Sequence, residues 1–213
     1  MNIPFSIDDF LNVFKVYNES VWPIQVILNI VAFALIILTF KKFKHSDKVI
    51  TLVLSFLWMW MGVAYHLILF TKINIAAYAF AAIFILQSMF FLYAGIKGKF
   101  IFLLDKNNKS ILGLIFIFYA LIFYPLLGNY LGHSYPLKPT FGLPCPTTIF
   151  TFGILLIVKN KIPPYYLGIP IIWSIVGFTA ALKLGMCEDI GLFITGIVAG
   201  SILIFDSVRK EIV

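Results

Sequence analysis

The chain has 213 residues, of which 62% are hydrophobic and only 12% are charged, and its mean hydropathy is +1.02. Soluble domains carry about 25% charged residues, so this composition excludes a water-soluble globular protein and predicts a chain whose solvent is the lipid bilayer. The formal net charge is +7. The lysines lie in short loops between apolar runs, which is typical of membrane orientation and argues against nucleic acid as a partner.

The first twenty residues form an amphipathic pattern. Between residues 6 and 21, apolar side chains recur at helical spacing on one face and charged side chains lie elsewhere. Ser6 and Asp9 have the spacing of a helix cap. The stretch is too short and too charged to cross a membrane, so it predicts a helix that lies in the interface. The charges also interrupt any apolar core, so we expect no cleavable signal peptide.

Seven apolar runs follow, and they predict an all-α, polytopic membrane protein with a single integral membrane domain over residues 1–213. The seven runs cover residues 22–40, 49–70, 74–96, 110–131, 146–158, 164–182 and 189–208. Most are close to the ~20 residues that a spanning helix needs. The fifth run is short, and we expect its proline-rich approach to extend it inside the protein rather than against lipid.

The basic residues predict the orientation. If all seven runs cross, twelve lysines and arginines fall on one side of the membrane and four on the other, which together are all 16 in the chain. Basic loops favour the cytoplasm. We therefore expect a protein of the cell (inner) membrane with its N-terminus outside and its C-terminus in the cytoplasm.

The sequence also contains a weak internal repeat. Trp22-Pro23 opens the first run and Cys145-Pro146 opens the fifth, and the second and sixth runs each carry a tryptophan followed by a glycine. This pattern is compatible with two parallel three-helix units joined by the fourth helix, a 3+1+3 repeat of the kind that occurs in transporters.

The segment from Gly132 to Gly153 is the longest non-helical stretch. Its prolines exclude a helix before Cys145, and Pro146 suits the first helical position. We expect the N–H groups of Thr147 and Thr148 to be free, which favours an anion or a reactive thiolate at Cys145. A buried structural cysteine, or a disulfide with Cys187, stays open as an alternative.

Polar side chains gather near the outer ends of the predicted helices, and polar residues within a membrane are functional candidates. This one-sided distribution predicts an outward-facing polar pocket that binds or transports a small solute. The proposed wall consists of Gln25, His66, Gln87, Cys145, Thr147, Thr148 and Asp189. His66 could instead bond a neighbouring carbonyl, and Asp189 could simply cap the seventh helix.

Other functions are compatible with the same residues. Cys145, His66 and Asp189 could serve a membrane-embedded enzyme or a metal or redox protein. His133, Cys187 and Glu188 are further outer-side candidates for metal ligands, although no spacing typical of a metal site is present. A third hypothesis is a structural subunit that contacts its partner within the membrane. The sequence identifies no cofactor, solute or oligomeric state.

Three blocks of sequence resemble one family. They are Tyr17-Asn-Glu-Ser-Val-Trp-Pro-Ile-Gln25, Leu57-Trp-Met-Trp-Met-Gly-Val-Ala-Tyr-His66 and Cys145-Pro-Thr-Thr-Ile-Phe-Thr-Phe-Gly153. They are similar to a bacterial multi-pass membrane family known only as a domain of unknown function, and the segment from Trp173 to Gly191 is similar too. The resemblance implies an integral membrane protein and brings no activity, substrate or cofactor.

Overall fold

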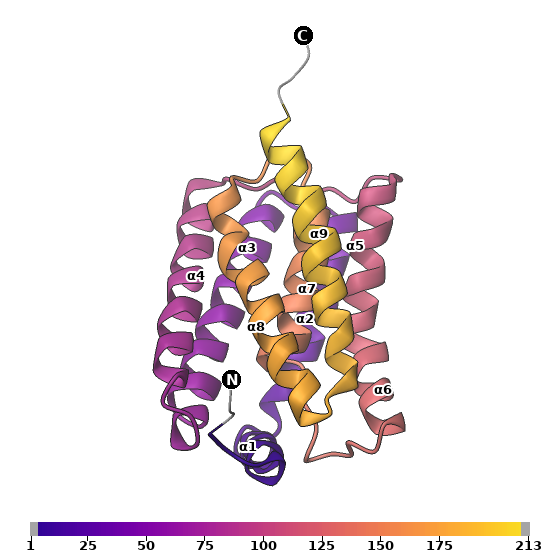
Figure 1. Ribbon diagram of the computed structural model, residues 1–213. Helices are drawn as coiled ribbons and strands as arrows, with labels where there is room; N and C mark the ends of the chain where they lie inside the picture. The colour runs from indigo at the N-terminus through magenta and orange to yellow at the C-terminus, as the bar shows by residue number, and fades with distance from the viewer. Residues whose placement is uncertain (1–3, 210–213) are drawn as a thin grey trace.

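The apolar runs form helices that pack side by side into a bundle (Figure 1). The structure is a computed structural model that describes residues 4–209, and within them the regular elements are helices, with two isolated β-bridges. The α-helices are α1 (Ile7–Ser20), α2 (Ile24–Phe40), α3 (Ser46–Trp60), α4 (Ala77–Lys97), α5 (Asn108–Phe118), α6 (Tyr124–Tyr130), α7 (Pro144–Leu156), α8 (Gly168–Leu184) and α9 (Ile190–Val208). The all-α, polytopic membrane architecture is confirmed.

Shorter turns join several of these helices. Two π-helical turns, η1 (Met61–Leu67) and η3 (Tyr119–Phe123), continue α3 and connect α5 to α6. Three 3₁₀ turns are η2 (Phe70–Lys72), η4 (Pro164–Tyr166) and η5 (Cys187–Asp189). A π-helical turn inserts a residue into the helical register and is frequent at functional sites.

All seven apolar runs of the sequence are helical, but they differ in length. In the described chain five segments are long and apolar enough to cross a bilayer: Ser46–Lys72, Ala77–Lys97, Asn108–Tyr130, Pro164–Leu184 and Cys187–Val208. The pair α1 and α2, bent by 82°, brings the count to six if it is one span. The remaining run is α7, which has 13 residues.

The N-terminal helix α1 is nearly perpendicular to the bundle axis and lies across one end of the bundle (Figure 1). The predicted cap is confirmed as a capping box between Ser6 and Asp9, in which each side chain bonds the other residue's backbone N–H. Its inner face buries Phe14 and Tyr17. This is the geometry expected of a helix in the membrane interface.

Helix α7 lies at the centre of the bundle. It is apolar all round, as a fully buried helix must be, and 12 of its 13 residues are buried. Its length of about 20 Å falls short of the roughly 30 Å hydrocarbon core. The prediction placed its first residue at Pro146; the helix begins two residues earlier, at Pro144, with Leu143 as N-cap.

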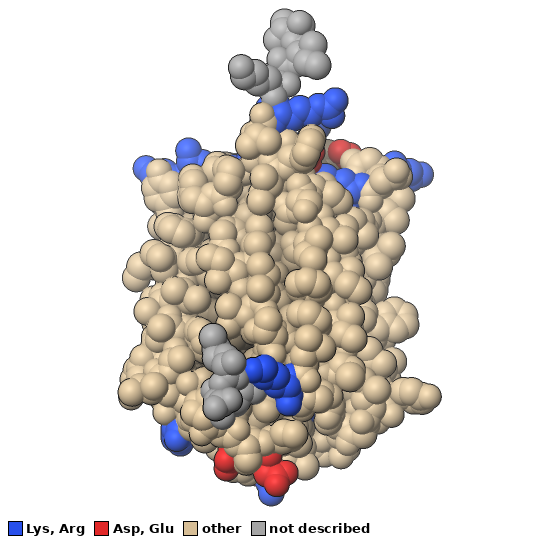
Figure 2. All heavy atoms as spheres, in the orientation of Figure 1, with Lys and Arg blue, Asp and Glu red and all other residues tan. Residues whose placement is uncertain are grey.

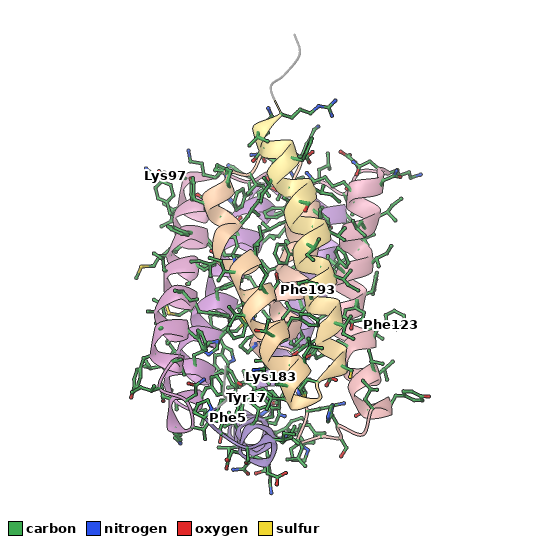
Figure 3. All side chains as sticks on the ribbon, viewed as in Figure 1. Phe5, Tyr17, Lys97, Phe123, Lys183 and Phe193 are labelled. Atoms are coloured by element: carbon green, nitrogen blue, oxygen red, sulfur yellow. The ribbon has the colours of Figure 1, made fainter. Side chains whose placement is uncertain are left out.

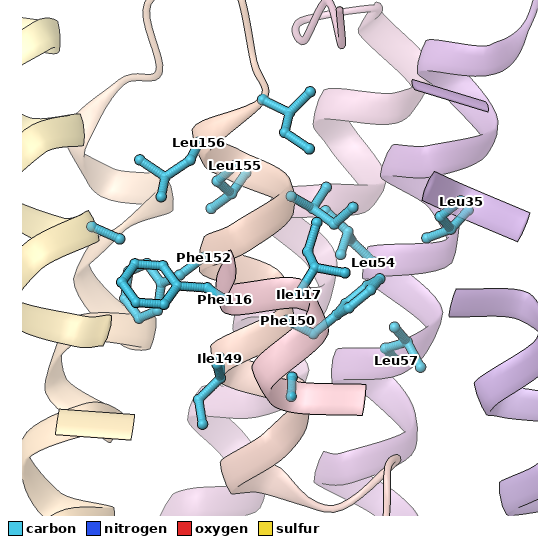
Figure 4. Packing of buried hydrophobic residues seen from close by; sticks show 14 of the residues in the cluster. Leu35, Leu54, Leu57, Phe116, Ile117, Ile149, Phe150, Phe152, Leu155 and Leu156 are labelled. Atoms are coloured by element: carbon cyan, nitrogen blue, oxygen red, sulfur yellow. The ribbon is translucent and has the colours of Figure 1, made fainter. Parts of the chain in front are cut away.

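The core around α7 is built from side chains of several surrounding helices. Phe150 and Phe152 of α7 pack among apolar side chains that include Leu54 of α3 and Phe116 of α5 (Figure 4). The backbones of α5 and α7 come so close that a Cβ on Gly153 would lie 2.7 Å from the carbonyl oxygen of Gly113. Small residues at such a contact are typical of helix pairs in membranes.

The charged side chains gather at the ends of the bundle (Figure 2). The loops after α2, α4 and α7 meet at one end, which we call the lysine-rich end: Lys159 N–H bonds the carbonyl of Ile101, and Phe102 N–H bonds Asp47. At the other, lysine-poor end lie α1, the segment 132–143 and η5. Tyr17 and Lys183 lie toward this end, opposite Lys97 (Figure 3).

Candidate functional site

The start of α7 is closed by its own side chains. The Thr147 hydroxyl accepts a hydrogen bond from Gly142 N–H at 3.0 Å, and Thr147 N–H bonds the Leu143 carbonyl. The prediction of a free, outward-pointing Thr147 N–H is therefore wrong. Thr147 and Thr148 are both fully buried. Because Pro144 and Pro146 have no N–H, this helix start offers an anion little to bind.

Asp189 is the centre of a small polar cluster at the lysine-poor end. The Tyr124 hydroxyl donates to its Oδ1 at 2.6 Å, and the Cys145 side chain lies close enough to interact electrostatically with its carboxylate. Asp189 is only 4% exposed. It occupies the N-cap position of α9, but its side chain makes no capping bond. Its carboxylate therefore faces two other elements instead of its own helix.

Glu188, the preceding residue, is a second buried carboxylate. It is 0% exposed, and its Oε1 lies 3.0 Å from Nδ1 of His133. The Tyr119 hydroxyl donates to the Glu188 backbone carbonyl at 2.8 Å. The second carboxylate oxygen, Oε2, is buried with no partner. An acceptor left without a donor is unusual in a protein interior and marks a place where a donor from a solute or water can bind.

Cys145 differs from the rest of α7, because it is half-buried while the other twelve residues of that helix are buried. Both cysteines are free thiols, Cys145 half-buried and Cys187 exposed. The structure therefore has no bridge between them. Tyr65 of η1 lies within electrostatic reach of both Cys145 and Asp189. The cluster thus draws on α6, α7, η5 and η1, which are far apart in sequence.

His66 lies in an aromatic box beside this cluster. It is fully buried, and its ring contacts those of Tyr65, Phe84 and Trp173 at centroid distances of 5.0, 4.6 and 5.1 Å. Neither ring nitrogen has a hydrogen-bond partner. The Cys145 side chain lies beside the Asp189 carboxylate, and it makes no hydrogen bond with His66. This arrangement lacks the thiol–imidazole bond that a Cys–His nucleophile needs.

Two predicted wall residues lie away from the cluster. Gln87 is fully buried in the middle of α4 and donates to the carbonyl of Tyr166 in η4 at 3.0 Å. Tyr166 itself packs on Phe100, in the loop of the lysine-rich end. Thr148 lies one residue into α7 beyond Thr147, and its hydroxyl has no partner. The structure brings together Cys145 and Asp189, places His66 nearby and leaves Gln87 apart.

Gln25 borders a groove instead. Its amide donates to the backbone carbonyl of Asn18 at 2.9 Å, while its Oε1 is buried without a partner. The groove has a volume of about 210 Å³ and lies between the start of α2, η3 and the segment 135–141. Tyr124 forms part of its wall and donates to Asp189 on its other side, so the groove and the cluster share this one residue.

Asn18 of α1 fastens the proline-rich segment over this end. Its amide donates to the carbonyls of Pro136 and Lys138 at 2.7 and 2.8 Å, and its Oδ1 accepts from the Thr140 hydroxyl at 2.7 Å. Tyr17 accepts from the indole N–H of Trp60 at 2.7 Å. These bonds hold the proline-rich segment in one path, because they satisfy two of its carbonyls and one of its hydroxyls.

Sequence reasoning missed the two tyrosines of the cluster. Tyr119 and Tyr124 lie in a run that reads as an ordinary spanning helix, and nothing local distinguishes them from aromatic core residues. His133 and Glu188 were considered only as metal ligands. In the described part of the chain, no group of three or more His, Cys, Asp or Glu side chains is placed to hold a metal ion.

One cation lies at the rim of the groove. The Lys138 ammonium donates to the Asn129 side chain at 2.8 Å and to the Pro125 carbonyl at 3.3 Å. Burial lowers the pKa of Lys138 from its usual value, because loss of water disfavours the charged form. Two of the three ammonium donors are occupied by these contacts, which leaves one for a ligand.

Comparison with known families identifies a relationship over almost the whole chain. Residues 7–212 match the family DUF6064, described as a family of unknown function. Neither the curated proteins nor the solved structures include a match. The resemblance inferred from the sequence blocks, to a family known only as a domain of unknown function, therefore agrees with this result, and the chain belongs to the DUF6064 family.

Proposed function

We propose that this membrane protein binds a small solute at the polar cluster formed by Cys145, Asp189, Glu188 and Tyr124. The observation that carries the proposal is the exposure pattern of α7: in a helix whose other twelve residues are buried, the one half-buried residue, Cys145, lies beside the buried carboxylate of Asp189. A polar group in such a position is costly in a membrane protein unless it serves a function.

The chemistry of the cluster favours a solute that donates hydrogen bonds. Two adjacent carboxylates are buried, and the oxygen Oε2 of Glu188 has no donor. Asp189 already accepts a hydrogen bond from Tyr124. A small amine or another compound rich in N–H or O–H groups would complement this site, whereas an anion would meet like charge.

Localisation is part of the same proposal. We propose that the protein resides in the cell (inner) membrane and that the lysine-poor end faces outward, because basic loops favour the cytoplasm. An impermeant thiol reagent added to intact cells should label the exposed Cys187. Labelling that occurs only after permeabilisation would place this end in the cytoplasm.

Protection of Cys145 from alkylation tests solute binding. In a Cys187→Ser protein we expect a small uncharged maleimide to modify Cys145 in the folded state. The matched control is Leu156→Cys in a protein without the native cysteines, because Leu156 lies at the other end of α7 and is 1% exposed. We expect this control to react only after unfolding.

Small amines, amino acids, polyols and carboxylates are then tested for slowing the Cys145 reaction. We expect donor-rich compounds to protect Cys145 in a saturable way, and we expect Tyr124→Phe and Asp189→Asn to remove the protection. Exposed Cys187, in a Cys145→Ser protein, controls for direct reaction with the compounds. The proposal fails if folded Cys145 does not react, or if no compound of these classes protects it.

A further inference from the structure

The groove beside Gln25 is a separate feature from the Cys145 cluster. Its opening follows the exposed side chains of Trp22, Val26 and Tyr135, which are 62%, 43% and 47% exposed. Val26 belongs to the face of α2 that also exposes Ile27 and Ile30. In a protein that spans a bilayer, this face meets lipid, so the groove opens sideways into the membrane.

The size of the groove limits what it can hold. Pockets that enclose a whole drug-sized ligand have volumes of about 300–1,000 Å³, and this one has about 210 Å³. It suits one part of a larger molecule whose remainder stays outside. A membrane lipid is such a molecule, because its acyl chains can remain in the bilayer while one segment occupies the groove.

The polar groups around the groove match the headgroup region of a phospholipid. Trp22 and Tyr135 stand at the opening, as aromatic residues do at the headgroup level of membrane proteins. Lys138 carries a positive charge next to Pro125, which lines the groove. Gln25 contributes Oε1, an acceptor that is buried and has no donor of its own.

Asn18 ties the backbone of Lys138 to Gln25. The side-chain amide of Asn18 donates to the Lys138 carbonyl, and its backbone carbonyl accepts from Gln25. The cation therefore lies at the rim of the groove, and the orphan acceptor lies buried in its wall. Phosphate complements the first and a headgroup hydroxyl or ammonium complements the second.

We propose that the groove is a binding site for one phospholipid whose headgroup donates hydrogen bonds. Its phosphate contacts Lys138, its headgroup donor bonds Gln25 Oε1, and the upper part of one acyl chain lies along the apolar wall. The proposal does not depend on solute binding at Cys145, because the two sites share only Tyr124 and are tested by different measurements.

Native mass spectrometry of delipidated protein tests the site. Phosphatidylglycerol, phosphatidylethanolamine and phosphatidylcholine are added separately, and the single lipid adduct that survives collisional activation is quantified. The first two headgroups have donors and the third has none. We expect phosphatidylcholine to bind about tenfold more weakly, the effect of one hydrogen bond of ordinary strength.

Two substitutions on one helix separate the groove from the rest of the lipid-facing surface. Val26→Trp fills the groove, while Ile27→Trp adds the same bulk at a neighbouring exposed position that does not line it. We expect Val26→Trp to lose the retained adduct and Ile27→Trp to keep it, with equal thermal midpoints. Lys138→Gln should reduce retention of all three phospholipids.

The following results would contradict the proposal. Equal retention in Val26→Trp and Ile27→Trp, or equal binding of phosphatidylcholine and phosphatidylglycerol, would mean that only unspecific surrounding lipid is detected. A dimer that dissociates on Val26→Trp, with no lipid adduct in the wild type, would mean that a second copy of the chain covers the groove.

Discussion

The two ends of α7 differ in the polar contacts that hold the neighbouring chain segments in place. At the lysine-rich end, chain segments are fastened by exposed or part-buried polar groups: Asn160 bonds the backbone of Lys99 and Ile101, and Lys109 pairs with Asp206 at 2.7 Å. At the lysine-poor end the polar groups are buried, as Asn18 and Asp189 are.

This difference separates a structural end from a candidate functional end. Exposed hydrogen bonds and ion pairs contribute little and are easily replaced by water. Buried polar groups are costly to leave without a partner, yet the lysine-poor end keeps unpartnered oxygens on Glu188, Gln25 and Thr148, whereas the lysine-rich end has only the Tyr166 hydroxyl among the described residues. A fold that needed only to be stable would have no reason to retain them.

The largest effect that separates the two ends is expected at two glycines with positive φ. Gly142 (φ +101) lies at the lysine-poor end and Gly98 (φ +60) at the lysine-rich end. A Cβ on Gly142 would lie 2.6 Å from Leu28 Cδ1 and 2.9 Å from the Tyr17 hydroxyl, while a Cβ on Gly98 would have nothing within 4 Å.

We therefore expect Gly98→Ala to lower the free energy of unfolding by about 1–2 kcal/mol, the cost of the backbone conformation alone. Gly142→Ala adds overpacking and should cost about 2–5 kcal/mol. Unfolding in mixed micelles, followed by circular dichroism, measures both. Equal losses would mean that the segment 135–143 is as free to shift as the loop after α4.

A second, smaller contrast concerns two asparagines that hold loops. Asn18→Ala leaves the carbonyls of Pro136 and Lys138 and the Thr140 hydroxyl without their donor or acceptor in a part-buried setting. We expect a loss of about 3 kcal/mol in the free energy of unfolding. Asn160→Ala removes comparable bonds at an exposed site, where water replaces them, and should cost about 1 kcal/mol or less.

Hydrogen exchange locates these losses. Asn18→Ala should speed exchange in the segment 132–143, and Asn160→Ala in the loop after α4, each leaving the other loop unchanged. If Asn160→Ala lowers the free energy of unfolding more than Asn18→Ala does, the buried contacts at the lysine-poor end are not the more important ones for stability.

Periodicity and composition were sufficient to predict the helices. The amphipathic start with its cap at Ser6, the seven apolar runs and the short fifth helix follow from local patterns. The same patterns placed Cys145 and Asp189 in one predicted wall, because both follow non-helical segments on the lysine-poor side. The 3+1+3 repeat stays a prediction.

The partners of those residues could not be predicted, because each is decided by tertiary contact. Gln87 was predicted to face a pocket, but its side-chain amide donates to the backbone carbonyl of Tyr166. His66 lies in a π-helical turn, where an extra residue rotates side chains away from the direction that α-helical spacing implies. Tyr124 carried no local signal, yet it makes the shortest bond to Asp189.

The smallest effect concerns helix caps, and it contrasts α1 with α5. Asp9 Oδ2 accepts hydrogen bonds from the hydroxyl and N–H of Ser6 at 2.7 and 3.1 Å, and these bonds lower the pKa of Asp9 from its usual 3.8. A carboxylate whose pKa is depressed by folding stabilises the folded state above its unfolded value, and this contribution is lost as pH falls through the folded value.

The cap of α5 uses Asn107, whose Oδ1 accepts from Ser110 N–H at 2.8 Å and does not titrate. Below pH 3.8 we therefore expect amide protection in the first turn of α1 to fall, after correction for the intrinsic pH dependence of exchange, while the first turn of α5 keeps its protection. Ser6→Ala should weaken the pH dependence at α1, because it removes the hydroxyl bonds of the capping box and leaves Asp9 only the backbone N–H of residue 6. Parallel loss at both helices would instead indicate that acid loosens the whole bundle, and the capping box would then not explain the pH dependence at α1.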